Sequence, residues 1–402
     1  MITSGESRVG YGEVIMLLST GRRCRALLGI VAVTLAAAAC STAAHPAAAR
    51  SESAARAAAR PYLLRFHAVS QIASTVPANG DVNPYGITVV PQTTGGLVRG
   101  DVLVSNFNSK ANVQGTGTTL VEISPQGTVT PFARLDALPA PLHCPGGVGL
   151  TTGLEVLPGG WVVAGSLPTV KGGALPALNP AGCLIVLDSH GKPVETWVNK
   201  DINGPWDMTM RAGPGHADLF VSDVLSRTGG PTSVPPPTGL CDVVRLDVSL
   251  APGTRPRLAG VTVVGSGFPW QQNKAALIQG PTGLALGPGG TLYVASTTGS
   301  SITAIPDAAT RNSPAKPGSG VLTSGGALDG PLGLTLAPGG DLIAVNGSNG
   351  NAVEITPGGR QVATVTLVQH GAGDLFGVTT PSDGQGLLFV NDGTNALDLL
   401  SG

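Results

Sequence analysis

The chain repeats a pattern of short apolar runs, and in most repeats one of these runs ends in a residue whose side chain carries an oxygen atom. The aligned residues at the end of this run are Asn106, Gly165, Asp223, Ser296, Asn346 and Asp392. Hard cations such as Ca²⁺ or Mg²⁺ bind where several carboxylate and amide oxygens converge. The alternative is that each side chain caps its own turn. The pattern therefore predicts either a metal site that includes Asp223, Asn346 and Asp392, or a set of turn caps.

Two acidic residues interrupt an otherwise neutral register. Glu155 stands where the other repeats carry Thr88, Thr209, Ala285, Thr335 and Thr379, and Asp207 stands where they carry glycine. Burying a carboxylate without a partner is costly, so each acid needs a partner or a shifted pKa. We expect Glu155 and Asp207 to bind a ligand, with Glu155 also a candidate metal ligand. The alternative is that both are structural.

In three repeats an aromatic residue comes immediately before the position that is glycine in five repeats and Asp207 in the sixth. These aromatic residues are Tyr85, Trp206 and Phe376. Near the centre of a ring of repeats, such rings either stack on a flat ligand such as a sugar or fill the central channel. Both alternatives stay open from the sequence.

Motifs that identify a reaction are missing from the sequence. It contains no Gly-x-Ser-x-Gly, no His-Glu-x-x-His and no phosphate-binding loop with its lysine. His143 and His370 are candidate general acids or bases, since a histidine titrates near neutral pH. His190 and His216 fall in turns on the other face of the predicted domain from His143 and His370, where we expect them to be solvated surface residues.

The elements that position these residues follow from the repeat. From Gly280 the chain reads "GPTGLALGPGGTLYVASTTGSSITAI", and from Gly330 it reads "GPLGLTLAPGGDLIAVNGSNGNAVEI". Four further places match this alternation of apolar strand, Gly-rich turn and apolar strand. Six repeats at a spacing of roughly fifty residues predict an all-β, six-bladed β-propeller of four-stranded blades. The 59 glycines and the low charged fraction of 12% agree with short buried strands joined by tight turns.

The two ends of the chain are expected to close this ring. The last repeat has three strands, near 376–379, 387–391 and 396–400. The segment "YLLRFHAVSQIAS" near the start of the domain is predicted to supply the missing outer strand. A closed ring would leave no exposed sheet edge in that blade.

The repeats resemble a known family. "PTGLALGPGGTLYVAST" and "LFGVTTPSDGQGLLFVNDGTNALDLL" are similar to NHL repeats, most clearly in the last three blades. Related six-bladed propellers include the gluconolactonase group, which resembles this chain in its mixture of Glu, Asn and Asp, and the streptogramin lyases. The resemblance implies either metal-dependent lactone hydrolysis or a lyase reaction, or binding without catalysis, as in many relatives.

Long insertions are expected on one face of the propeller, which we call the top face. It carries the connections into each first strand and between each second and third strand. The insertions are 107–117, 166–182, 224–240 and 265–280. Cys144 and Cys183 fall in two loops of the same blade, so we predict a disulfide between them. The alternative is that the thiols stay unpaired.

The N-terminal region is interpreted as a targeting segment. Basic residues precede an apolar run from Ala26 to Ala39, which is too short to span a bilayer and is typical of a signal peptide. Ala37-Ala38-Ala39-Cys40 resembles a bacterial lipobox, so Cys40 is the predicted lipidation site. The predicted organisation is a signal peptide over 1–39, with 1–15 a candidate extension before Met16, a lipidated tether over 40–60 and the propeller over 61–402.

Charge limits the partners of the protein. The formal net charge is −1, which provides no basic surface for nucleic acid. We expect an exported, membrane-anchored monomer in the cell envelope that binds a small molecule or an envelope protein through its top face. The alternative is a metal-dependent lactonase-like hydrolase or a lyase.

Overall fold

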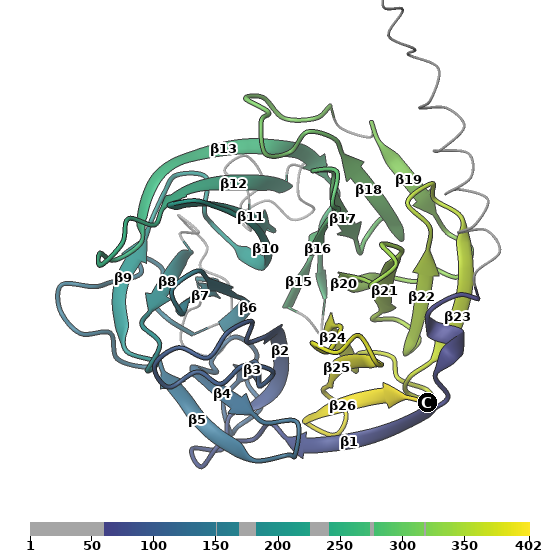
Figure 1. Ribbon diagram of the computed structural model, residues 1–402, viewed down its shortest axis with the longest axis horizontal. Helices are drawn as coiled ribbons and strands as arrows, with labels where there is room; N and C mark the ends of the chain where they lie inside the picture. Colours follow the sequence, from purple (N-terminus) through teal and green to yellow (C-terminus); the bar gives the residue numbers. More distant parts are fainter. Residues whose placement is uncertain (1–59, 150, 169–181, 226–240, 274–276, 317–318) are drawn as a thin grey trace, which may run out of the picture. The chain divides into compact units, whose positions relative to one another are not determined.

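The computed structural model describes residues 60–402 apart from 150, 169–181, 226–240, 274–276 and 317–318. Six four-stranded antiparallel sheets stand around a central axis, as predicted (Figure 1). Each sheet is one blade, and its first strand lies nearest the axis. Among the described residues, no helix is long and apolar enough to cross a membrane.

The first three blades follow the chain in order. Blade 1 contains β2 (Val82–Val89), β3 (Val102–Asn108), β4 (Thr119–Ile123) and β5 (Val129–Arg134). Blade 2 contains β6 (Thr151–Leu157), β7 (Trp161–Ser166), β8 (Cys183–Leu187) and β9 (Pro193–Trp197). Blade 3 contains β10 (Pro205–Gly213), β11 (His216–Asp223), β12 (Cys241–Ser249) and β13 (Arg257–Phe268).

The remaining blades continue the same order. A short hairpin of β14 (Gln271–Asn273) and β15 (Leu277–Gln279) precedes blade 4. Blade 4 contains β16 (Pro281–Leu286), β17 (Leu292–Ser296), β18 (Ser301–Ile305) and β19 (Val321–Ser324). Blade 5 contains β20 (Pro331–Leu336), β21 (Leu342–Asn346), β22 (Asn351–Ile355) and β23 (Gln361–Thr366). Blade 6 contains β24 (Leu375–Thr379), β25 (Leu387–Asn391), β26 (Ala396–Ser401) and the N-terminal β1 (Ala68–Ser74).

Blade 6 confirms the predicted closure. Strand β1 pairs antiparallel with β26, from Ala68 opposite Ser401 to Ser74 opposite Ala396, and the two strands lie side by side in Figure 1. The expected strand is shorter at its start, because Leu63–Arg65 forms a 3₁₀ helix, η1. The carboxylate of Glu354 accepts hydrogen bonds from the backbone N–H groups of Tyr62 and Leu63, both at 2.8 Å. These bonds attach the start of the domain to blade 5.

Glycine is required where the first strands approach one another around the axis. A Cβ atom on these glycines would lie less than 3.0 Å from the backbone of the next blade, a separation that real side chains do not adopt. The glycines are Gly86, Gly153, Gly283, Gly333 and Gly377. The corresponding residue of blade 3 is Asp207. The centre of the propeller is therefore packed backbone to backbone in five of its six blades.

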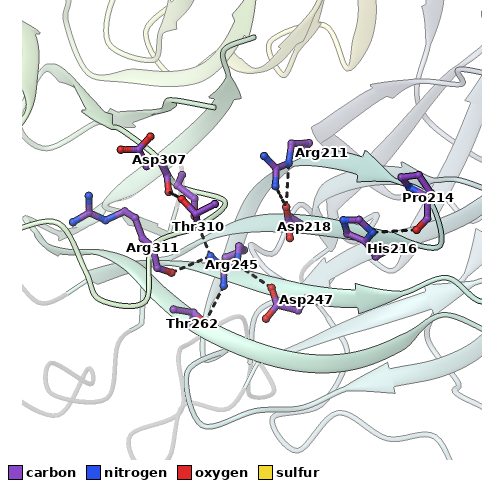
Figure 2. A network of polar contacts seen from close by, with 11 residues as sticks. Arg211, Pro214, His216, Asp218, Arg245, Asp247, Thr262, Asp307, Thr310 and Arg311 are labelled. Atoms are coloured by element: carbon purple, nitrogen blue, oxygen red, sulfur yellow. Dashed lines mark hydrogen bonds and ion pairs between the residues drawn. The ribbon is translucent and has the colours of Figure 1, made fainter. Parts of the chain in front are cut away.

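A buried arginine joins blade 3 to the connection between β18 and β19. Figure 2 shows the Arg245 guanidinium between its own blade and this connection. It donates to the backbone carbonyls of Arg311 at 2.9 Å and Ala308 at 3.3 Å, and to the carboxylate of Asp247 at 2.9 Å. Hydrogen bonds from a buried charged group are stronger than neutral ones, so the connection is firmly held.

The first prediction concerns the closing strand. Deleting residues 41–59 should leave the unfolding temperature nearly unchanged, because the described contacts of blade 6 begin at Tyr62. Deleting residues 41–74 removes β1 and exposes the edge of β26, so the ring should open and the protein should melt far earlier. Both chains are to be compared by thermal unfolding followed by circular dichroism. Equal melting temperatures would contradict closure by β1.

Candidate functional site

Aromatic side chains fill the axis at its top end. The ring of Tyr85 lies 4.4 Å from that of Phe376, 4.9 Å from that of Trp206 and 4.6 Å from that of Phe107, measured between centroids. Tyr85, Trp206 and Phe376 are each no more than 4% exposed. Stacking on a ligand would require these rings to separate first, since almost none of their surface is accessible.

The space next to the aromatic rings is small. A cavity of about 30 Å³ is lined by Tyr85, Trp206, Asp207 and Phe376 together with the axial glycines. A water molecule needs about 10–15 Å³ on this measure, so the cavity admits one or two waters. The Tyr85 hydroxyl has no hydrogen-bond partner among the described residues. Burial, together with the nearby carboxylates of Asp207 and Asp392, holds the pKa of Tyr85 well above its usual value.

Asp207 connects blade 3 to the inner strand of blade 4 through a short chain of hydrogen bonds. Its carboxylate accepts a hydrogen bond from Leu284 N–H of blade 4 at 3.0 Å, and its own N–H donates to Ser222 Oγ at 3.1 Å. Ser222 Oγ in turn donates to the carbonyl of Thr282 in blade 4 at 2.7 Å. Burial raises the pKa of Asp207 to about 6, against the lowering effect of these backbone donors. The carboxylate thus takes over part of the contact that the other blades make through glycine.

Glu155 lies two residues after the axial glycine of blade 2 and is partly buried. Strand pairing puts it opposite Val163, in the register predicted from the sequence. One carboxylate oxygen accepts a hydrogen bond from the N–H of Val156 at 2.9 Å. Burial raises the pKa of Glu155 to about 7, and the nearby carboxylate of Asp207 adds to the rise. The pKa values of Glu155 and Asp207 are therefore both raised, mainly by burial.

The expected ring of oxygen-bearing residues needs a correction in two blades. The residues paired with the start of each first strand are Asn106, Ser166, Asp223, Ser296, Asn346 and Asn391. Ser166 and Asn391 therefore replace the aligned Gly165 and Asp392. In blade 2 the second strand ends one residue later than the aligned residue, at Ser166, and in blade 6 it ends one residue earlier, at Asn391.

The candidate metal ligands bond to their own loops. Asp223 accepts hydrogen bonds from the N–H groups of Asn203, Gly204 and Leu225 at 2.6 to 2.9 Å. Asn346 donates to the carbonyl of Ala327 at 2.8 Å and to the side chain of Asn349 at 3.1 Å. In the described part of the chain, no group of three or more His, Cys, Asp or Glu residues could hold a metal ion.

Asp392, the last candidate ligand, lies next to blade 1. Its carboxylate accepts a hydrogen bond from the Asn83 side chain at 3.1 Å. Burial raises the pKa of Asp392 to about 6, with a further contribution from Asp374. Burial likewise raises the pKa of Asp223 to about 6.

The candidate histidines lie apart from these acids. His143 is exposed and its ring contacts only the carbonyl of Pro141, at 3.4 Å. His370 is exposed in the turn after β23 and adopts a positive φ of 56°. No hydrogen bond or ion pair joins either ring to a carboxylate among the described residues.

The disulfide between Cys144 and Cys183 is confirmed, with a Cα–Cα separation of 5.5 Å. Of the predicted insertions, 169–181 and 226–240 lie outside the described residues. The predicted insertion 265–280 is wrong at its start, because β13 continues to Phe268. The sequence reasoning also missed the long connection 306–320 between β18 and β19, whose high content of Pro, Ser and Gly was the available signal.

Comparisons with known proteins support the fold. No family model matches the sequence, and no curated protein matches it. Among solved structures, the calcium-binding protein regucalcin from Agrobacterium tumefaciens is 15% identical, covers 82% of this chain and 92% of its own, and gives a TM-score of 0.50. A luciferin-regenerating enzyme is 12% identical, with an alignment that covers 83% of this chain and 95% of its own and a TM-score of 0.50. A gluconolactonase from Xanthomonas campestris is 16% identical, with an alignment that covers 84% of this chain and 96% of its own and a TM-score of 0.49. The chain shares its propeller fold with the first two of these structures.

The second prediction tests whether Asp207 is structural. Asp207→Gly should lower the free energy of unfolding by about 1–3 kcal/mol, because the buried N–H of Leu284 loses its acceptor. Asp207→Asn is the matched control and should lose less, since its amide oxygen can still accept that bond. Urea unfolding measures both variants. A glycine variant as stable as the wild type would show that the carboxylate does not support the blades.

The third prediction concerns pH. An acid whose pKa is raised by folding keeps its proton in the folded chain where the unfolded chain has lost it. Its contribution to stability is complete below about pH 4 and is lost as the pH rises through about 6 to 7. We expect the melting temperature to fall between pH 5 and pH 8. Glu155→Gln is neutral throughout, so its melting temperature should fall less steeply. Parallel curves for the variant and the wild type would contradict the raised pKa of Glu155.

Proposed function

We propose that this protein is a binding propeller that holds a small molecule or a protein partner on its top face, outside the closed axis, without catalysis. The observation that carries the proposal is the packing of Tyr85, Phe107, Trp206 and Phe376 across the top of the axis. These rings leave a cavity of only about 30 Å³, too small for an organic substrate.

The second support is the dispersion of the candidate metal ligands. Asp223 already receives three backbone N–H donors, and a coordinated cation would have to compete with them. The Asn346 side chain bonds to the carbonyl of Ala327, and the Asp392 carboxylate bonds to Asn83 of blade 1. These residues do not fit one shared Ca²⁺ or Mg²⁺ ion, which needs several oxygens around a single point.

The second candidate function is that of a metal-dependent lactonase-like hydrolase or a lyase. The comparisons favour it over binding, because the similar structures include a calcium-binding regucalcin, two gluconolactonases and streptogramin B lyases. The buried acids Glu155 and Asp207, whose pKa values are raised to about 7 and about 6, are the chemical feature that agrees with it. The closed axis favours binding instead.

One experiment separates the two candidates. The purified protein is dialysed, its metal content is measured, and hydrolysis of glucono-1,5-lactone is followed with and without Ca²⁺, Mg²⁺ and Zn²⁺. We expect substoichiometric metal and a hydrolysis rate equal to that of buffer. Stoichiometric metal with metal-dependent turnover would overturn the binding proposal. Loss of that turnover in Glu155→Gln would then assign the reaction to the axis.

We also propose that the protein is exported and anchored by a lipid on Cys40, as its N-terminal sequence predicts. This supports a role in the cell envelope with a membrane-tethered propeller. Cys40→Ser should move the protein from the membrane fraction to a soluble or unprocessed form. Unchanged membrane fractionation of that variant would refute the anchor.

A further inference from the structure

A larger pocket lies away from the axis, between blades 3 and 4. Its volume is about 220 Å³, compared with about 30 Å³ at the axis. The end of β13 forms one wall, strands β17 to β19 form the second, and the connection after β18 forms the third. The pocket has room for a small organic molecule, and none of the candidate residues from the sequence lines it, except Ser296 of the expected oxygen ring.

Hydroxyl groups line the blade 4 wall where packing alone would favour apolar side chains. Ser301, Thr303 and Ile305 alternate along β18 and therefore share one face of the strand. In the same register, the third strands of blades 1, 2 and 5 carry the apolar residues Val121, Ile185 and Val353. A buried hydroxyl is costly unless it forms a hydrogen bond. Thr303 is 8% exposed, and no hydrogen bond of its hydroxyl is found among the described residues, although this hydroxyl is not completely enclosed.

A second hydroxyl in the pocket also has no partner. Ser296 is 2% exposed, and its Oγ has no hydrogen-bond partner among the described residues. A Cβ atom placed on Gly299 would lie 3.0 Å from Ser296 Oγ and 3.2 Å from Ser301 Oγ. The glycine thus leaves a position open between two hydroxyls, close to hydrogen-bond distance from both.

The rest of the lining restricts the chemistry of the ligand. Phe268, at the end of β13, supplies apolar surface to the pocket, while Ile305 on β18 is fully buried. Lys316 is the one charged residue that lines the pocket, and no described carboxylate does. A cation is therefore disfavoured. Since a hydroxyl both donates and accepts hydrogen bonds, these walls complement a ligand that carries hydroxyl groups of its own.

The pocket is formed before any ligand binds, because its third wall is fixed to blade 3. The N–H of Ala315 donates to the carbonyl of Val264 at 2.8 Å. The Arg245 guanidinium holds the carbonyls of Ala308 and Arg311 earlier in the same connection (Figure 2). Preorganised walls lower the entropic cost of binding.

We propose that this pocket binds a small hydroxylated molecule of the polyol or monosaccharide class. The hydroxyls of Ser301 and Thr303 bond to those of the ligand, Ser296 Oγ is reached through the position that Gly299 leaves open, and Phe268 contacts the carbon skeleton of the ligand. The proposal rests on the binding function proposed above and names its ligand class, but it places the site between blades 3 and 4, with one wall from the connection between β18 and β19, instead of among the top-face connections alone.

The test uses the purified protein with D-glucose, D-mannitol and myo-inositol as probes, and inorganic phosphate as the anion control. Binding is measured by saturation-transfer NMR and titration calorimetry. Gly299→Ala fills the position between the two hydroxyls, and Thr303→Val removes one hydroxyl with little change of shape. Gly289→Ala is the matched control, because its added Cβ meets no atom within 4 Å. Melting temperatures establish that each variant is folded.

We expect at least one polyol or sugar to bind the wild type and Gly289→Ala equally, and to bind Gly299→Ala and Thr303→Val about tenfold or more weakly, as loss of a buried hydrogen bond implies. Equal affinity in all four proteins, binding of phosphate alone, or binding of no probe would overturn the proposal that this pocket binds a hydroxylated molecule. Metal-dependent turnover of the lactone would instead overturn the proposed function, so the two failures are distinguishable.

Discussion

The close approach of six first strands around one axis is the constraint on which the structure depends. In five blades the strands meet so tightly that only glycine fits, and a single Cβ would collide with the backbone of the next blade. Blade 3 departs from this arrangement and uses the carboxylate of Asp207 to reach Leu284. The ring can close only if the last blade is complete, which explains why β1 from the N-terminal end pairs with β26.

The same constraint moves the available space outward. Tyr85, Trp206 and Phe376 each come immediately before the residue at which the first strand meets the next blade. Their rings therefore converge and pack where a ligand would enter. Space for a small molecule is found between blades instead, where a long connection after β18 is fixed by Arg245 and Ala315. Because burial raises the pKa values of Glu155 and Asp207, we expect the stability of the folded state to depend on pH.

The sequence predicts the architecture well because the repeat is explicit. The six blades, the closing strand and the disulfide between Cys144 and Cys183 all follow from the spacing of strands and loops. The residues at the ends of the second strands of blades 2 and 6 are Ser166 and Asn391, each one residue from the aligned position, because the apolar pattern does not mark where a strand ends.

The sites are harder to predict, because partners distant in sequence determine them. The three backbone donors of Asp223 come from a loop that the sequence does not distinguish from a metal site. Thr303 is an ordinary strand residue until the register aligns it with Val121, Ile185 and Val353. The pocket beside it also needs a wall from the connection after β18, whose path across blade 3 no local pattern indicates.

The central claim is that the axis is closed and that ligands bind elsewhere. It is tested most directly by anomalous diffraction from crystals of the propeller grown with Tb³⁺ in place of Ca²⁺. The account predicts electron density for the packed rings of Tyr85, Trp206 and Phe376 and no terbium peak between them or beside Glu155 and Asp207. A fully occupied terbium site on the axis, coordinated by those acids or by Asp223 and Asp392, would contradict it.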